Sequence, residues 1–156
     1  MTAAAMTFAE RWTLTSQEIA ATLEGVEEND FAAVAETLAA SGRIFVAGAG
    51  RSGLLGRMLA MRLAQAGFAS HVVGESTTPA IAAGDLLFIC SGSGQTATLL
   101  PVAEKAGALG AKIILLTYRI GSPLALHADL ILNLPVPLDP TRPGGLAGEQ
   151  LLPFGP

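Results

Sequence analysis

Two short segments combine glycine with small hydroxyl side chains, which are residue types that bind a phosphate without a cation. One is SGSGQT, residues 91–96, and the other is GAGRSG, residues 48–53. Glycine lets backbone N–H groups approach an anion, a helix N-terminus adds the positive end of its dipole, and serine and threonine add hydroxyl donors. We therefore predict a phosphate cradle in the first segment, built from Ser91, Gly92, Ser93, Gly94, Gln95 and Thr96.

Two other interpretations of these segments stay open. SGSGQT is also compatible with a plain turn in which Ser93 caps a helix. GAGRSG lacks the lysine–serine ending of a Walker A loop, and it matches the dinucleotide pattern G-x-G-x-x-G only at Gly48 and Gly50. A dinucleotide-binding domain would also need an acidic residue after the second strand, which is roughly where Glu75 lies.

Apolar runs alternating with helical segments must position these loops. We predict strands over residues 43–48, 69–74, 85–90, 111–118 and 129–136, long helices over 51–67 and 94–109, and a short helix over 122–128. Continuous apolar strands of this kind indicate a parallel sheet covered on both faces. The predicted fold class is α/β, a three-layer, doubly wound, five-stranded parallel sheet of the flavodoxin-like type, with ligands beyond the carboxyl ends of the strands. Pro101 is expected to kink the second long helix.

The two ends of the chain differ from this core. Residues 1–41 are predicted to be a helical lead-in, with helices over residues 8–23 and from Asn29 or Asp30 to Ala39, and with Gly42 at the second helix's end. Residues 42–136 are the α/β core. Residues 137–156 hold five of the nine prolines and are predicted to be a loop or disordered tail, without a final helix. The whole chain, residues 1–156, is predicted to be one domain.

Composition excludes several classes of function. The formal net charge of −4 disfavours a nucleic-acid-binding surface. No apolar run approaches the roughly 20 residues of a membrane span, and the N-terminus does not match a signal peptide, so we expect a cytoplasmic protein. Cys90 is the single cysteine and is expected to be buried and unreactive. His71 and His127 are expected to be packed or surface residues, and neither has a metal-ligand partner at a recognisable spacing, so no metal is predicted.

Several of these motifs together resemble the sugar isomerase (SIS) domain family. They are GAGRSG, AMRLAQAGF, VVGESTTPAI, GDLLFICSGSGQT and SPLALHADLIL, which lie between about residues 30 and 136. Within that superfamily the chain looks closest to the 6-phospho-3-hexuloisomerases, with arabinose-5-phosphate-type isomerases as the alternative that shares both loops. The resemblance implies interconversion of 3-hexulose 6-phosphate and fructose 6-phosphate in the ribulose monophosphate pathway of formaldehyde fixation, without a metal or redox cofactor.

The resemblance also assigns roles to residues. It implies that Ser91, Ser93 and Thr96, with the amides between them, bind the phosphate, that Ser52 contacts the substrate, and that Arg51 approaches the sugar or the phosphate. Proteins of this family commonly form homodimers or homotetramers, and we expect the lead-in to pack against another subunit.

The catalytic base is the point at which this chain departs from the family. The family's glutamate lies beyond a stretch similar to LLPFGP, and the chain ends at Pro156, before such a glutamate. Glu149 lies upstream of that stretch and is a poor substitute. Glu75 is then the candidate base, although a structural or interface role suits it better. Two functions follow as hypotheses, an isomerase and a module that binds a sugar phosphate without turning it over.

Overall fold

The computed structural model describes residues 7–136. The chain divides into two units, one made by residues 27–133 and the other by residues 1–26 together with 134–156. The predictions for the tail, including Glu149 and the missing final helix, lie outside the described residues. The prediction that the whole chain is one domain stays a prediction.

The larger unit is built on a five-stranded parallel sheet, which confirms the predicted fold class. Its strands are β1 (Arg43–Gly48), β2 (Ala69–Val72), β3 (Leu86–Cys90), β4 (Lys112–Thr117) and β5 (Leu130–Asn133). Their spatial order is β2-β1-β3-β4-β5, which is the flavodoxin-like order. The order reverses between β1 and β3, where Gly48 pairs with Cys90 at the carboxyl ends of both strands. A ligand site is therefore expected beside these two residues.

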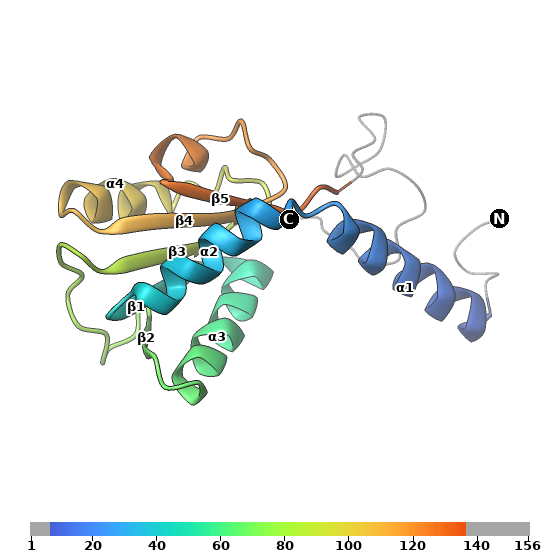
Figure 1. Cartoon of the computed structure of the whole chain (residues 1–156), viewed down its shortest axis with the longest axis horizontal. Helices are drawn as coiled ribbons and strands as arrows, with labels where there is room; N and C mark the ends of the chain where they lie inside the picture. The colour runs from blue at the N-terminus through green and yellow to red at the C-terminus, as the bar shows by residue number, and fades with distance from the viewer. Residues whose placement is uncertain (1–6, 137–156) are drawn as a thin grey trace. The chain divides into compact units, whose positions relative to one another are not determined.

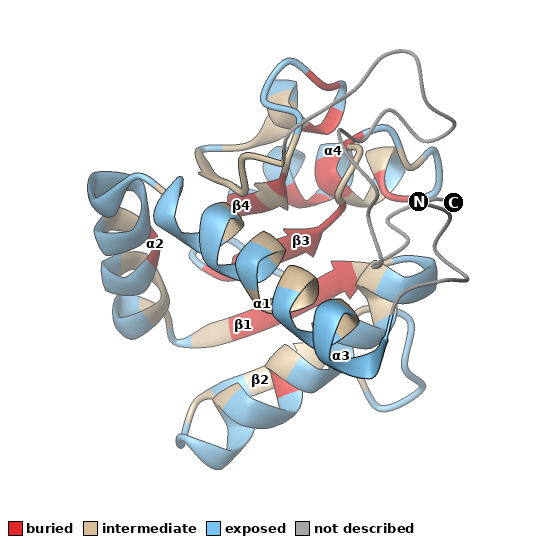
Figure 2. Cartoon of the chain, turned by 90° about the vertical axis from the view of Figure 1, so that its right-hand side faces the viewer, coloured by how far each residue is buried: buried red, intermediate tan, exposed pale blue. Residues whose placement is uncertain are grey.

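Alternate side chains of the strands point to opposite faces of the sheet, and helices cover both faces (Figure 1). Ile44 and Val46 belong to a cluster with residues of α2 (Glu28–Ala40) and α3 (Gly50–Gln65). Phe45 and Ala47 belong to the opposite cluster, with residues of α4 (Leu100–Ala108) and the 3-10 helix η2 (Leu124–His127). Figure 2 shows the consequence, since burial is concentrated in β1, β3 and β4. Each fully buried leucine or isoleucine stabilises the fold by about 1.5–3 kcal/mol.

Helix α3 lies unusually close to β1 because glycines face each other at the contact. A Cβ placed on Gly48 would lie 2.8 Å from the Ser52 carbonyl oxygen and 2.9 Å from the Gly53 Cα. Gly56 repeats the close approach one turn later, against Val46. GAGRSG is therefore, in part, a packing motif that brings the start of α3 onto the sheet.

Helix α4 is shorter than the sequence predicted. It begins at Leu100 rather than at Gly94, and Leu99, not Ser93, is its N-cap residue. Gly94 has a φ of +62°, which an α-helix cannot accommodate, so the chain turns before the helix starts. Pro101 consequently lies in the first turn, where its missing N–H has no partner to lose, and the predicted kink is wrong.

Other boundaries differ by smaller amounts. Helix α2 begins at Glu28 without a side-chain cap, so Asn29 and Asp30 do not cap it. It ends on an extended Ser41, and Gly42 does not adopt the left-handed conformation of a C-terminal glycine cap. Strand β5 ends at Asn133, three residues before the predicted end.

Charged side chains close the amino ends of the strands. Asp85 accepts hydrogen bonds from Arg43 Nε at 2.9 Å, Arg43 Nη2 at 2.6 Å and the Ala82 amide at 2.7 Å. Burial disfavours the Asp85 carboxylate, but the bonds from Arg43 and Ala82 outweigh burial and lower the pKa of Asp85. Asp129 likewise accepts from the Ile113 amide at 2.7 Å.

The smaller unit contains helix α1 (Phe8–Glu24). Thr7 and Glu10 form a capping box at its start. No residue of α1 is buried, and its large apolar side chains, Phe8, Trp12, Ile19 and Leu23, are exposed by 85, 66, 48 and 60%. At 100° per residue these four positions fall on one side of the helix.

Among the described helices, none combines the length and hydrophobicity that crossing a bilayer demands.

Candidate functional site

The two glycine-rich segments lie side by side at the carboxyl ends of β1 and β3. GAGRSG leaves β1 at Gly48, and SGSGQT leaves β3 directly after Cys90, the residue paired with Gly48. The structure thus brings Arg51, Ser52 and the predicted cradle to the reversal point of the strand order, which is where ligands bind in open α/β sheets.

Hydroxyl groups organise the SGSGQT segment from within. Ser91 is 3% exposed, and its Oγ lies 3.0 Å from the Thr96 Oγ1. Ser93 Oγ accepts from the Gln95 amide at 3.3 Å, and the Gly94 amide donates to the Ser91 carbonyl at 3.1 Å. Because Gly94 is left-handed, the segment turns back on itself. Ser91 and Gly94 are buried, Gly92, Ser93 and Thr96 are half-buried, and Gln95 is exposed.

A second layer of residues supports this segment from β4 and the connection that follows it. Thr117 donates to the Gly92 carbonyl at 2.7 Å, and the Tyr118 amide donates to the same carbonyl at 3.1 Å. The Tyr118 ring lies so close to Gly92 that a Cβ there would come within 2.9 Å of it. Sequence reasoning missed both residues. Their one signal was their position at the carboxyl end of the strand next to β3.

The first turn of α3 supplies the other half of the site. Ala49 is its N-cap residue and provides no side-chain hydrogen bond, so the first amides of a 16-residue helix have no cap. Ser52 is half-buried and Arg51 is exposed in this turn. Within the described part of the chain, no hydrogen bond or ion pair joins the Arg51 side chain to another residue. The helix N-terminus nearest to the carboxyl ends of β1 and β3 is that of α3, because α4 starts only at Leu100. The helix dipole at this edge is therefore that of α3.

Glu75 lies apart from these loops, after the edge strand β2. Its carboxylate forms an ion pair with Arg57 of α3, and its side chain is 42% exposed. Strand β1 lies between β2 and β3 in the sheet. The pairing with Arg57 agrees with a structural role.

Cys90 and the two histidines are the other residues whose side chains could carry chemistry. Cys90 is buried, and burial raises its thiol pKa to about 11, so it is not a nucleophile at neutral pH. The His71 ring lies 5.1 Å from the Phe45 ring, and His127 Nε2 lies 4.0 Å from a Glu104 oxygen. Within residues 7–136, no group of three or more His, Cys, Asp or Glu residues is arranged to hold a metal ion.

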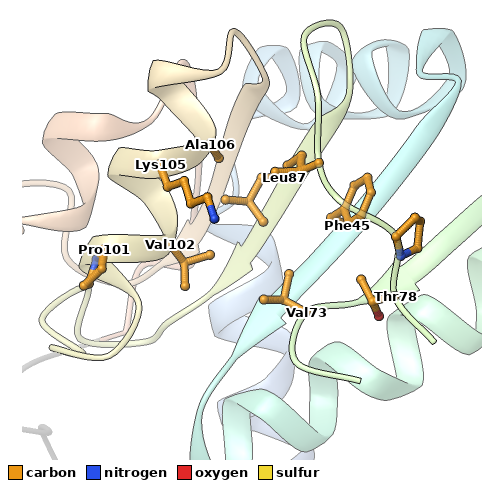
Figure 3. A pocket seen from close by; sticks show the side chains of 10 residues that line it. Phe45, Val73, Thr78, Leu87, Pro101, Val102, Lys105 and Ala106 are labelled. Atoms are coloured by element: carbon orange, nitrogen blue, oxygen red, sulfur yellow. The ribbon is translucent and has the colours of Figure 1, made fainter. Parts of the chain in front are cut away.

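A pocket of about 350 Å³ opens elsewhere, on the α4 face of the sheet (Figure 3). Its lining is mostly apolar and consists of Phe45, Val73, Thr78, Pro79, Ile81, Leu87, Pro101, Val102, Lys105 and Ala106. Figure 3 shows the Lys105 amine among these apolar side chains. None of the predicted phosphate ligands lines this pocket, and its lining does not suit a sugar phosphate, which needs many polar partners.

Comparison with known proteins shows the family to which the chain belongs. A family model described as SIS domain matches residues 37–143, which include both glycine-rich segments and all five strands. The chain belongs to the SIS domain family. Its strand order and paired loops are therefore those of a known sugar isomerase domain, as the sequence motifs predicted.

Individual relatives narrow the resemblance. The chain is 48% identical over 122 residues to the 3-hexulose-6-phosphate isomerase of Mycobacterium gastri, a match covering 78% of this chain and 61% of that protein. It is 52% identical over 92 residues to the enzyme of the same name from Methylomonas aminofaciens, covering 59% of this chain and 51% of that protein. The chain thus spans about half to three fifths of the length of these relatives.

A solved structure gives the same picture. A protein of Methanococcus jannaschii, whose crystal structure was reported to infer a function of 3-hexulose-6-phosphate isomerase, superposes with a TM-score of 0.68 and 40% identity. The match covers 71% of this chain and 62% of that one.

Proposed function

We propose that this chain carries the sugar-phosphate site of an isomerase that converts 3-hexulose 6-phosphate into fructose 6-phosphate. The observation that carries the proposal is the hydroxyl-rich SGSGQT segment beside the uncapped start of α3, at the point where the strand order reverses. The relatives that are about half identical to this chain bear the name of that isomerase. The ribulose monophosphate pathway of formaldehyde fixation is the proposed setting.

In this proposal the cradle binds the phosphate and leaves the chemistry to the other end of the sugar. Ser91, Ser93, Thr96 and the amides between them hold the phosphate oxygens, and Ser52 and Arg51 of α3 contact the sugar or the phosphate. A base removes the proton on C2, next to the C3 carbonyl, and an enediolate forms. The proton then returns at C3, and a hydroxyl proton passes from the C2 oxygen to the C3 oxygen, which leaves the carbonyl at C2 and a hydroxyl at C3. The reaction needs neither a redox cofactor nor a metal.

The base is the part of this proposal that residues 7–136 do not supply in a recognisable form. Glu75 is paired with Arg57. It follows β2, and β2 and β3 lie on opposite sides of β1 in the sheet. We therefore propose a structural role for Glu75. Binding without turnover is then the second candidate function for the chain as it stands.

An activity assay beside a binding assay tests the two candidates. Fructose 6-phosphate is titrated into the 156-residue chain by calorimetry, and isomerisation is followed by coupling to the oxidation of glucose 6-phosphate. We expect binding with little turnover, and full turnover in a version extended to the length of the relatives. Full turnover by the short chain would contradict our placing of the base. Absence of binding by both versions would contradict the site itself.

We further propose that the protein is a cytoplasmic homo-oligomer in which α1 packs on a second copy. Four large apolar side chains on one side of α1 are exposed by 48 to 85%, and an unpartnered stripe of this kind favours association. Light scattering of the wild type and of Trp12→Glu tests the idea. We expect a dimer or tetramer for the wild type and a smaller species for the variant, whereas a monomeric wild type contradicts it.

A further inference from the structure

Ser122 carries a buried hydroxyl without a hydrogen-bond partner. It lies in the connection between β4 and η2, it is 1% exposed, and its Oγ makes no hydrogen bond. An unpaired buried polar group costs free energy, and such groups are few in folded proteins. Its position beside the phosphate cradle suggests where a partner comes from.

The hydroxyl faces Gly94, the left-handed residue of the cradle. A Cβ built on Gly94 would overlap both the Oγ and the Cβ of Ser122, so the serine occupies the space in which a side chain at residue 94 would stand. The same connection also contacts Gly94 through its backbone, because the Leu124 amide donates to the Gly94 carbonyl at 3.0 Å.

The neighbouring hydroxyl, on Thr117, has already used its one proton in a hydrogen bond, so it cannot donate to a further group. It donates to the Gly92 carbonyl at 2.7 Å and accepts from the Arg119 amide at 3.1 Å. Thr117 is 1% exposed, like Ser122. Of these two buried hydroxyls beneath the cradle, one is therefore already paired and one is still available.

Binding of an anion to the cradle would leave a backbone carbonyl without its hydrogen-bond donor, and the Ser122 hydroxyl is a donor that could replace it. In the structure the Gly94 amide donates to the Ser91 carbonyl at 3.1 Å. An anion that takes up this N–H leaves the Ser91 carbonyl without its donor. A hydroxyl packed against Gly94 is well placed to compensate, and the compensation lowers the cost of turning the amide toward the anion.

We infer that Ser122 is a positioning residue of the anion site, whose hydroxyl pairs with the cradle backbone when an anion takes up the Gly94 amide. Ser122 acts through Gly94 and does not itself touch the sugar. The inference rests on the proposed function, because it requires that the SGSGQT segment binds a phosphate.

The test separates affinity from stability with Ser122→Ala. Inorganic phosphate and fructose 6-phosphate are titrated into each protein by calorimetry, and the thermal midpoint of the unliganded protein is measured by circular dichroism. We expect affinity for both ligands to fall about 5- to 20-fold, since a hydrogen bond linked to a charged ligand is lost. The midpoint should stay unchanged or rise, because the substitution removes an unpaired buried hydroxyl.

Ser70→Ala is the matched control. Ser70 in β2 also has a buried Oγ without a partner, and it lies at the edge strand, away from the cradle. Its replacement should have the same effect on the midpoint and none on affinity. A Ser122→Ala protein that binds both ligands like the wild type overturns the inference, and so does one whose affinity and midpoint fall together.

Ser91→Ala distinguishes failure of this inference from failure of the proposed function. If Ser91→Ala loses affinity and Ser122→Ala does not, the cradle stands and the role of Ser122 is wrong. If the wild type binds neither ligand, the proposed function is wrong and the inference is wrong with it.

A double substitution tests the contact itself. Gly94→Ala should destabilise the protein, through overlap with Ser122 and through the left-handed backbone. Adding Ser122→Gly should recover part of the lost thermal midpoint, because only the overlap is relieved. Strictly additive effects of the two substitutions would contradict the contact.

Discussion

At the amino ends of the strands Asp85 binds Arg43 and the Ala82 amide, whereas at the carboxyl ends Ser91 and Thr96 bind chiefly each other. The first end uses full charges and pairs them within the protein. The second end uses neutral hydroxyls and backbone amides, and it leaves Ser122 unpaired. The charged pair at the amino end is thus satisfied within the protein, and the Ser122 hydroxyl beside the cradle is not.

This contrast suits the proposed binding of a doubly charged phosphate by a loop that has no lysine. A fixed cation near the site would be attracted to any carboxylate nearby, as Arg43 is to Asp85. Amides and hydroxyls carry only partial charges, so they stay available beside one another and still add up to a favourable potential for an anion. The three predictions below probe the contrast, in order of decreasing effect.

Replacing a glycine at the carboxyl end of β1 should destabilise the protein far more than replacing a glycine before its amino end. Gly48→Ala puts a Cβ within 2.8–3.0 Å of backbone atoms of Ser52 and Gly53, and we expect it to lower the free energy of unfolding by about 2–4 kcal/mol. Gly42→Ala, before β1, places its Cβ in open space and should change stability by less than about 0.5 kcal/mol. Urea unfolding followed by circular dichroism measures both. Equal losses would mean that the close approach of α3 to β1 is not rigid.

Replacing a serine at each end should separate binding from folding. Ser91→Ala removes a donor to the phosphate and should weaken fructose 6-phosphate binding by about 1–3 kcal/mol, with little change in stability. Ser41→Ala, at the amino end, removes a bond of 2.7 Å to the Thr37 carbonyl and should leave affinity unchanged. Titration calorimetry measures the affinities. Binding that is unchanged in Ser91→Ala would show that the phosphate lies elsewhere.

The charged pair at the amino end should produce the smallest effect, and one that depends on pH. The pKa of Asp85 is lowered in the folded protein, so its contribution to stability is present above its unfolded pKa of about 3.9. That contribution is lost as the pH falls through the lower, folded value. We expect the urea midpoints of wild type and Asp85→Asn to differ at pH 7 and to converge once the pH is below the lowered pKa of folded Asp85. A difference that is constant across this range would contradict the role of the carboxylate.

The fold was readable from the sequence because its main signals are local. Runs such as LLFIC pack on both faces, and that requirement is visible without knowledge of any distant contact. The start of α4 was not readable for the opposite reason. Residues 94–99 have a composition compatible with a helix. The space that a side chain at Gly94 would need is filled by Ser122, 28 positions further along the chain, and the sequence does not reveal such a contact.

The site was predictable to the same extent. The glycines and serines of the SGSGQT loop predicted that loop. Its supporting residues, Thr117, Tyr118 and Ser122, come from the neighbouring strand β4 and the connection after it. Such support becomes visible only when the strand order places β4 beside β3. The roles of the predicted site residues stay predictions, and these residues are Arg51, Ser52, Glu75, Ser91, Gly92, Ser93, Gly94, Gln95 and Thr96.

The distribution of aromatic chromophores has a practical consequence for every optical measurement on this protein. The single tryptophan, Trp12, is 66% exposed on α1, and the single tyrosine, Tyr118, lies against Gly92. Tryptophan emission will therefore follow the surroundings of α1 and will say little about melting of the sheet. Tyrosine absorption, by contrast, gives a built-in spectroscopic label at the cradle, and a difference spectrum recorded on adding phosphate would report occupancy without any attached dye.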